Sequence, residues 1–464
     1  MADETRQLAQ FVANLTYEQI PQRVRVRAIQ LLTDQLGVQV GCSEMPWAKQ
    51  IRNVYRRTRG KPESTVIRYG DRLPADATAF INSAFGHSFE YDDANALTHG
   101  HTGAELIPAL MAIAEREHIS GKELLTTFVA AYEVRGRIGW ALSPDLATRG
   151  GPQYSVTCGP FGAAAGVARL LKMDADGIRQ AMAIAGCYAG GLAQYDHGGG
   201  SCKRIFTAIA TDNGMRAAFL AQGGITGPEE ILEGPHGLLK IYSEDQRPQL
   251  LVAELGQRWT IDNATFKPYC CCAVIHPAID GMRKLVVDHG LRADDIESVE
   301  VSYAAASYQH AAITDPKDLL GMQFSTAYSL ALTVLKERNT PKQYTLAALK
   351  DPAVRAFAAK VSIQRDDSLG QYYETHRPAR VKARTRSGVV HETLIMDAKG
   401  TAAVPFSSDD VDEKFRSQVA EVVGAERCEA LLRALHEIDT LDDVADLLPL
   451  LVLPKRTRRK KVSG

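Results

Sequence analysis

The densest group of side chains able to transfer protons lies in the run HSFEYDDANALTHGH, from His87 to His101. Neighbouring carboxyl groups and imidazoles are the groups that proton transfer near neutral pH requires. The same residue types could bind a metal ion, or could simply form a polar loop. The run lies between two apolar helical patterns, which favours an inner connection of a helical domain. Its acids and histidines are His87, Glu90, Asp92, Asp93, His99 and His101.

A second candidate site is the glycine run Gly198–Gly200, which precedes Ser201, Cys202 and Lys203 and then a helical pattern. The backbone N–H groups at the start of a helix, together with a lysine, can bind an anion. The spacing does not match a phosphate-binding loop, whereas a carboxylate would fit. The alternative is a flexible connector that carries a surface lysine.

The third cluster, KPYCCCAVIH, runs from Lys267 to His276 and contains three consecutive cysteines. Three adjacent cysteines cannot all face one metal ion, so buried structural thiols are a better interpretation than a zinc site. The composition of the chain changes near residue 258, and a junction between two domains is a common place for a small-molecule cleft.

The overall composition is that of an ordinary globular protein, with 464 residues of which 45% are hydrophobic and 23% charged. The formal net charge is -1, which offers no global field for nucleic acid or anionic lipid. No apolar run approaches the roughly 18 residues of a membrane span, and the N-terminus lacks a signal-peptide pattern. We therefore expect a cytoplasmic protein with reduced thiols, no membrane or nucleic-acid partner, and a disordered basic tail at 455–464.

Helical periodicity runs through about the first 255 residues, for example at Leu8, Phe11, Val12 and Leu15. Small residues dominate the later helical segments, so we expect the helix backbones to pack closely there. These segments are 162–171, 181–191 and 208–221. A helical pattern resumes at Ser408, where the acidic residues that follow suit the first turn of a helix.

The intervening stretch, at about 258–402, has a mixed pattern. Helical patterns lie at about 273–288 and 324–337. Strands are predicted at 296–303, 379–386 and 389–396, the last two joined by a hairpin turn at Ser387-Gly388. Helical stretches that bracket an α+β segment predict a mainly α fold with an α+β second domain, in which the helical domain is discontinuous in sequence.

Taken in order, these and other short motifs make the sequence resemble the MmgE/PrpD family, from about residue 5 to 450. This family includes 2-methylcitrate dehydratase, cis-aconitate decarboxylase and iminodisuccinate epimerase. The resemblance is carried by FGH at 85–87, YDD at 91–93, GHTG at 100–103, CGPFGAA at 158–164, GITGP at 224–228, KPY at 267–269, HPAID at 276–280 and QFS at 323–325.

The resemblance implies a two-domain subunit with its active site between the domains. An all-helical domain would comprise 1–265 and 403–454, and a smaller α+β lid would comprise 266–402. It also implies a homodimer that acts on small di- or tricarboxylates without a metal or organic cofactor. The shared chemistry of the family is proton removal, or its reverse, at a carbon next to a carboxylate.

The resemblance also implies which residues form the site. His101, Tyr154 and Lys203 are the expected catalytic residues. Three positions depart from the family pattern. Glu90 stands where an aspartate is usual, and Tyr154 stands where many decarboxylase-like and dehydratase-like members have a histidine. Cys272 stands where the aconitate decarboxylases have a histidine. The tyrosine at position 154 makes the sequence more similar to the epimerases of the family. The expected substrate-binding residues are Glu90, Asp93, Lys267, Cys272, His276 and Tyr328.

The function expected from these residues is a lyase of the hydratase or dehydratase type. An epimerase is the nearest alternative, followed by a decarboxylase and then by a non-catalytic carboxylate-binding protein. A phenol with a normal pKa near 10 is a poor base, so Tyr154 would need a cation that lowers its pKa. Lys203 is the candidate for that cation.

Overall fold

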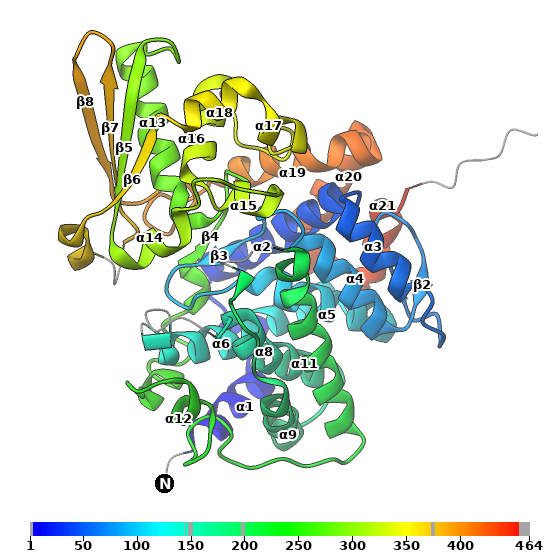
Figure 1. Ribbon diagram of the computed structural model, residues 1–464. Helices are drawn as coiled ribbons and strands as arrows, with labels where there is room; N and C mark the ends of the chain where they lie inside the picture. Colours follow the sequence, from blue (N-terminus) through cyan, green and yellow to red (C-terminus); the bar gives the residue numbers. More distant parts are fainter. Residues whose placement is uncertain (1–2, 144, 147–151, 196–199, 373–375, 454–464) are drawn as a thin grey trace, which may run out of the picture.

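The computed structural model describes residues 3–143, 145–146, 152–195, 200–372 and 376–453 (Figure 1). Gly198 and Gly199 of the glycine run, and the basic tail at 455–464, therefore lie outside the described residues. No described helix is both long enough and apolar enough to span a membrane.

Helices form most of the described chain before residue 260, as the periodicity predicts. Three of the helices named below begin with a side chain that accepts a hydrogen bond from a free backbone N–H, at Ser120, Gln153 and Asp174. The helices are α1 (Glu4–Asn14), α2 (Gln22–Cys42), α3 (Pro46–Tyr55), α4 (Ala75–Gly86), α5 (Thr102–Glu117), α6 (Gly121–Leu142), α8 (Tyr154–Leu170), α9 (Ala175–Ala185), α11 (Phe206–Gln222) and α12 (Leu238–Tyr242).

The small-residue segments form α8, α9 and α11, which pack against one another as predicted. Gly214 of α11 shows how close the backbones are, since a Cβ there would lie 2.4 Å from the Cβ of Ala163 on α8. Any side chain at residue 214, even the methyl group of alanine, would force the two helices apart.

The four-stranded sheet is built from β5 (Ile296–Tyr303), β6 (Val361–Arg365), β7 (Ala379–Thr385) and β8 (Val390–Ile395), in the order β6-β5-β7-β8. β5 and β6 are parallel, and the other pairs are antiparallel. The predicted strands and the β7–β8 hairpin are confirmed. The further helices of this part are α13 (His276–His289), α14 (Ala305–Ala311), α15 (Leu319–Gln323), α16 (Thr326–Lys336), α17 (Leu346–Lys350) and α18 (Pro352–Ala358).

The chain returns to the helical part after the sheet, as Figure 1 shows. Helix α19 (Ser408–Val423) packs against α2, and α20 (Ala425–His436) and α21 (Leu448–Leu451) follow. The main apolar core accordingly joins residues 8–266 with residues 406–451, whereas a second core is formed mostly by residues 269–383. This confirms a mainly α fold with a smaller α+β part; the exact domain boundaries remain a prediction.

Two short antiparallel ribbons also occur in the mainly helical part. The first pairs β1 (Ser64–Thr65) with β2 (Arg72–Leu73), and the second pairs β3 (Ala94–Asn95) with β4 (Ala264–Thr265). Strands of two residues are too short for an alternating pattern to be visible in the sequence. The β3–β4 pairing brings the acid- and histidine-rich run next to the segment that begins at Lys267.

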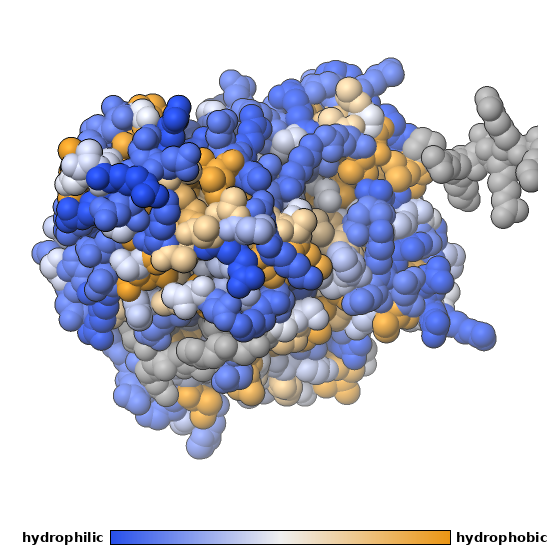
Figure 2. All heavy atoms as spheres, turned by 45° about the horizontal axis from the view of Figure 1, so that its top comes forward, coloured by the Kyte–Doolittle hydropathy of each residue, from blue (hydrophilic) through white to orange (hydrophobic). Residues whose placement is uncertain are grey.

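The surface viewed in Figure 2 is mostly hydrophilic, and apolar side chains are scattered over it in small groups. Among the most exposed apolar residues of the described chain are Val287, on α13, and Leu192. Single exposed apolar side chains are normal in globular proteins and need no functional explanation.

Candidate active site

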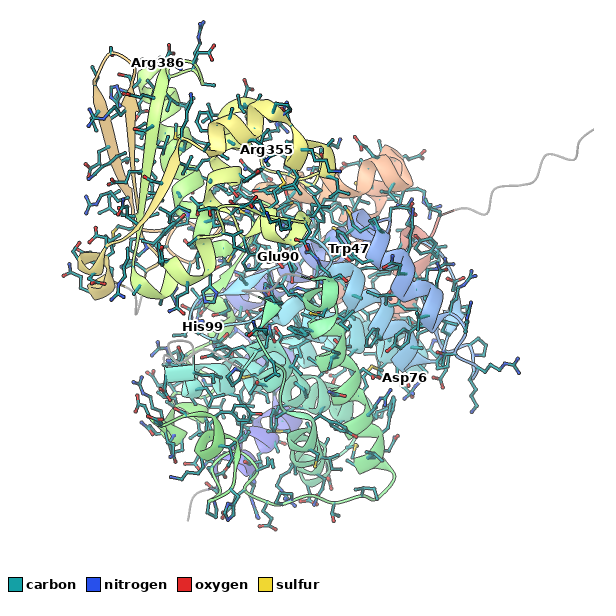
Figure 3. All side chains as sticks on the ribbon, viewed as in Figure 1. Trp47, Asp76, Glu90, His99, Arg355 and Arg386 are labelled. Carbon is teal, nitrogen blue, oxygen red and sulfur yellow. The ribbon has the colours of Figure 1, made fainter. Side chains whose placement is uncertain are left out.

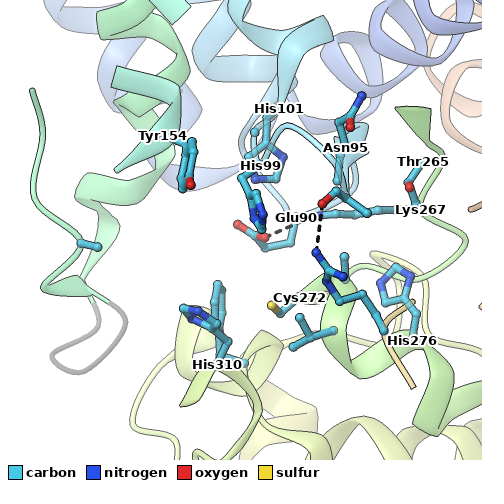
Figure 4. Close-up of a pocket in the computed structure, with 18 of the residues that line it drawn as sticks. Glu90, Asn95, His99, His101, Tyr154, Thr265, Lys267, Cys272, His276 and His310 are labelled. Atoms are coloured by element: carbon cyan, nitrogen blue, oxygen red, sulfur yellow. Dashed lines mark hydrogen bonds and ion pairs between the residues drawn. The ribbon is translucent and has the colours of Figure 1, made fainter. Parts of the chain in front are cut away.

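A cavity of about 500 Å³ lies where the helical part meets the α+β part. Figure 3 shows Glu90 and His99 at this boundary, and Figure 4 shows the side chains that surround the cavity. Seven of the nine residues expected from the sequence line it, namely Glu90, His101, Tyr154, Lys203, Lys267, Cys272 and His276. Asp93 and Tyr328 are not among the described residues that line it.

Asp93 lies behind the cavity, where it caps helix α5. Its two carboxylate oxygens accept hydrogen bonds of 3.0 and 3.1 Å from the backbone N–H of Gly103, in the first turn of the helix. Burial and the neighbouring charge of Asp92 raise the pKa of Asp93 well above its usual value. Asp93 therefore helps to fix the position of His101, which immediately precedes α5.

His101 presents one ring nitrogen to acceptors and leaves the other for a substrate. Its Nδ1 lies 2.9 Å from the carbonyl oxygen of Asp93 and 3.1 Å from a carboxylate oxygen of Asp92. Because both partners only accept hydrogen bonds, they favour the tautomer in which Nδ1 carries the proton, and in that tautomer Nε2 has a free lone pair. The side chain is 15% exposed, so it can act as a base towards the cavity.

His87 and Asp92 extend this network beneath the cavity. One carboxylate oxygen of Asp92 lies 2.8 Å from Nδ1 of His87, and the rings of His87 and His101 meet edge to face. Burial would by itself raise the pKa of Asp92, but the two imidazoles hold it well below its usual value. Burial, together with the charge of Lys203, lowers the pKa of His87 to about 3, so that ring is neutral.

Glu90 is held by two lysines that come from distant parts of the chain. Lys203 donates a hydrogen bond to one of its carboxylate oxygens, and Nζ of Lys267 lies 3.3 Å from the other. Arg204 approaches to 3.9 Å. Burial would raise the pKa of Glu90, but the lysines hold it well below its usual value, so the carboxylate is ionised.

The pKa of Lys267 is likewise governed by this cluster. Burial would lower it, but the charges of Glu90 and Asp92 raise it above its usual value, so Lys267 is a cation. An ammonium group has three N–H donors, and the bond to Glu90 uses one. The cluster therefore has both positive charge and hydrogen-bond donors that a substrate carboxylate could engage.

Tyr154 forms another wall of the cavity at the first residue of α8, whose N-terminus is capped by Gln153. Its ring stacks on that of His99, with the centroids 5.0 Å apart, and Figure 4 shows both side chains at the cavity. Lys203 bonds to Glu90 and to Nε2 of His87, at 3.2 Å. The expectation that Lys203 tunes Tyr154 stays a prediction.

Cys272 and His276 line the cavity from the α+β part. Nε2 of His276 donates to the carbonyl oxygen of Cys271 at 3.2 Å, and burial and Lys267 lower the pKa of His276 to about 3. Cys270 and Cys271 are fully buried free thiols, as predicted, whereas Cys272 is half-buried. Burial raises the pKa of Cys271 to about 12, so that thiol is not ionised.

Tyr328 lies in α16, where its backbone N–H bonds to Ser325 and its side chain packs in the second apolar core.

Sequence reasoning missed other side chains of the cavity. His99 lay in the acid- and histidine-rich run but received no role, and Arg377 follows no recognisable motif. The missed polar lining residues are Asn95, His99, Gln153, Gln194, Tyr195, Thr265, Gln309, His310, Arg377 and Thr401.

His87, Asp92 and His101 each offer a donor atom within 4.8 Å of the others, which is the spacing of a possible metal site. The contacts favour a proton network instead. Both Nδ1 atoms already point their protons at Asp92, and the ammonium group of Lys203 lies beside His87. A cation bound here would have to displace these hydrogen bonds and would be repelled by the lysine.

The sequence was compared with known proteins. Residues 6–251 match the MmgE/PrpD N-terminal domain, and residues 269–439 match the MmgE/PrpD C-terminal domain. A cis-aconitate decarboxylase-like protein of Aspergillus oryzae is 27% identical, over 96% of this chain and 97% of its own length. Cis-aconitate decarboxylases of Aspergillus terreus and Homo sapiens are each 26% identical, over 98% and 97% of this chain and 96% and 95% of their own lengths.

Proposed function

The chain belongs to the MmgE/PrpD family, and from this premise we propose that it is a lyase of the hydratase or dehydratase type. Its substrate is a small di- or tricarboxylate, from which it removes a proton at the carbon next to a carboxylate. One observation carries the proposal: a cluster of cations around Glu90 and an imidazole with an available Nε2 face the same cavity.

The substrate carboxylate binds at the lysine pair. Lys203 and Lys267 lie on the wall of the cavity formed with Glu90, and Arg377 lines it from the α+β part, where it donates to the carbonyl oxygen of Ala96 at 2.9 Å. Cations from two parts of the chain suit a substrate that carries more than one carboxylate.

His101 is the base. Its Nε2 takes the proton from the substrate carbon, and the negative charge that develops on the substrate carboxylate is stabilised by Lys203 and Lys267. The imidazolium that forms is stabilised by Asp92, which accepts the Nδ1 proton at 3.1 Å. Asp92 thus has the orienting role that a carboxylate has beside a general-base histidine.

Tyr154 is the acid. A phenol with its usual pKa of about 10 is protonated at neutral pH and can give its proton to a departing hydroxyl group. Loss of that hydroxyl as water, after removal of the neighbouring proton, completes a dehydration. The reverse sequence is a hydration. Neither step needs a metal or an organic cofactor, and we propose that the enzyme uses none.

Two other reactions fit the same cavity. Decarboxylation is favoured by the names of the relatives. Against it, Cys272 lines the cavity where the aconitate decarboxylases have a histidine, and Tyr154 lines it where many decarboxylase-like and dehydratase-like members have one. Epimerisation would use Tyr154 and His101 on opposite faces of one carbon. The homodimer and the cytoplasmic location that were expected from the sequence remain predictions.

A screen of polycarboxylates separates these reactions. The purified protein is incubated with citrate, methylcitrate, aconitate, malate, tartrate or iminodisuccinate in deuterated water. Formation or loss of a C=C bond without release of carbon dioxide supports the lyase. Carbon dioxide release supports decarboxylation, and deuterium incorporation with loss of optical activity supports epimerisation. If none of these acids binds, the carboxylate substrate class is wrong.

A further inference from the structure

A buried arginine lies directly beneath the loop that carries His99 and His101. Arg135, on α6, is fully buried. Its Nη1 donates to the carbonyl oxygen of Thr98 and its Nη2 to that of His99, each at 2.8 Å. One guanidinium group therefore holds two consecutive backbone carbonyls of this loop.

Glu105 connects the same arginine to His101. One carboxylate oxygen of Glu105 accepts from Nε of Arg135 at 2.7 Å, and the other accepts from the backbone N–H of His101 at 3.0 Å. Arg135 and Glu105 thus bond to the main chain at residues 98, 99 and 101. Neither side chain touches the cavity, since neither is among its lining residues.

The loop is shaped to fit around this guanidinium group. A Cβ at Gly100 would lie 1.6 Å from Nη2 of Arg135, so a side chain at this position would displace the arginine. His99 has a φ of 47°, in the left-handed region that a residue with a side chain rarely adopts. This backbone path persists only where the surroundings determine it.

We propose that Arg135 and Glu105 are positioning residues, which hold the 98–101 loop so that His101 points Nε2 into the cavity and His99 stacks on Tyr154. The proposal rests on the proposed function, in which His101 is the base. A guanidinium group provides five N–H donors in one plane, and here they are divided between a carboxylate and two carbonyls. A lysine has the charge but cannot reproduce this planar arrangement.

The chain contains a matched control. Arg137 and Glu133, on the same helix, form a second ion pair that is equally buried. Arg137 donates to the carbonyl oxygens of Ala253 and Arg258, at 2.7 and 2.8 Å, rather than to the 98–101 loop. Breaking either pair removes a buried charge partner and destabilises the fold. Only the Arg135 pair holds the loop of His101.

The test compares Arg135→Ala with Arg137→Ala. For the Arg135 variant we expect kcat to fall by about a hundredfold with little change in KM, because displacement of a catalytic group by about 1 Å has an effect of this size. Guanidinium ion at low concentration should restore part of the kcat of this variant. The Arg137 variant should lose stability while its kcat stays close to that of the wild type.

Two further measurements keep the test decisive. If Arg135→Ala does not fold, Gly100→Ala takes its place in the test. This variant adds only a methyl group against Arg135, and we expect it to lower kcat in the same way. Amide hydrogen exchange of residues 98–104 should accelerate in Gly100→Ala and Arg135→Ala but not in Arg137→Ala, and this readout needs no substrate.

Unchanged kcat and unchanged exchange in a folded Arg135→Ala protein would overturn the positioning role. Full activity of a His101→Asn protein would show that His101 is not the base. This result contradicts the proposed function, whereas the result for Arg135→Ala contradicts only the positioning role.

Discussion

Nζ of Lys267 lies 3.3 Å from a carboxylate oxygen of Glu90, although the two residues are 177 positions apart in the chain. Glu90 precedes the ribbon strand β3, and Lys267 follows the strand β4 that pairs with it. The ribbon therefore brings a carboxylate of the helical part to a lysine at the start of the α+β part. This contact completes the cation cluster at which we propose that the substrate binds.

Lys203 is the first residue to test in that cluster. Lys203→Met should lower kcat/KM by at least about a hundredfold, because a fixed donor to the developing charge is lost. Lys267 still balances Glu90 in this variant, so we expect it to fold. Lys360→Met is the control, since Lys360 donates to backbone carbonyls of Ala293 and Ile296 instead. Equal activities of the two variants would refute the role of Lys203.

Tyr154 should contribute its hydroxyl group and not only its ring. Tyr154→Phe keeps the stacking on His99 and should lower kcat by a factor of about 10² or more, as expected for loss of a general acid. Tyr154→His should not restore the rate, because both the pKa and the reach of the group change. Tyr344→Phe is the control, as this tyrosine is buried in the second core. A fully active Tyr154→Phe enzyme would leave proton transfer to His101 alone.

His276 should make the stability of the protein depend on pH. Its pKa is lowered to about 3 in the folded protein, whereas an unfolded histidine titrates near pH 6.5. Below about pH 6.5 the unfolded chain therefore binds a proton that the folded chain does not, and stability falls as the pH falls towards 3. At about pH 5 the protonation of His276 in the unfolded chain lowers the free energy of unfolding by about 2 kcal/mol.

The measurement is the change in the free energy of unfolding between about pH 7.5 and 5, for the wild type and for His276→Gln. The wild type should lose more stability than the variant over this interval. The comparison cancels the contributions of other groups, among them the raised pKa of Asp93, which acts in the opposite direction. Parallel curves for the two proteins would show that His276 is not buried in its neutral form.

Metal removal should leave the activity unchanged. His87, Asp92 and His101 have the spacing of a metal site, but we interpret them as a proton network. Dialysis against a chelator, followed by addition of zinc, iron or magnesium, tests this directly. Loss of activity on dialysis and its recovery with one of these ions would establish a metal centre.

Much of the fold could be predicted from the sequence, because periodicity is visible wherever an element is long. Strand β5 was predicted at its observed bounds, Ile296–Tyr303. Strand β6 was missed, since it has only five residues, and Val361 is the only one of them that is buried. The paired strands β3 and β4, which are decisive for the cavity, have two residues each and leave no pattern.

The candidate site could be predicted in residue identity but not in arrangement. The run from His87 to His101 showed which groups were available, but not that Asp92 lies between two imidazoles. That geometry depends on the path of the loop, which is held by Arg135, an arginine on another helix. Tyr328 was expected at the site, but it packs in the apolar core of the α+β part.

The central claim is that His101 exchanges a proton with the carbon next to a substrate carboxylate. It is tested most directly by NMR or mass spectrometry of the active polycarboxylate after incubation in deuterated water. We predict that the wild type and the exposed-histidine control His118→Asn incorporate deuterium at that carbon, while His101→Asn binds the acid but incorporates at least about a hundredfold less. Deuterium incorporation by His101→Asn at the wild-type rate would contradict the account.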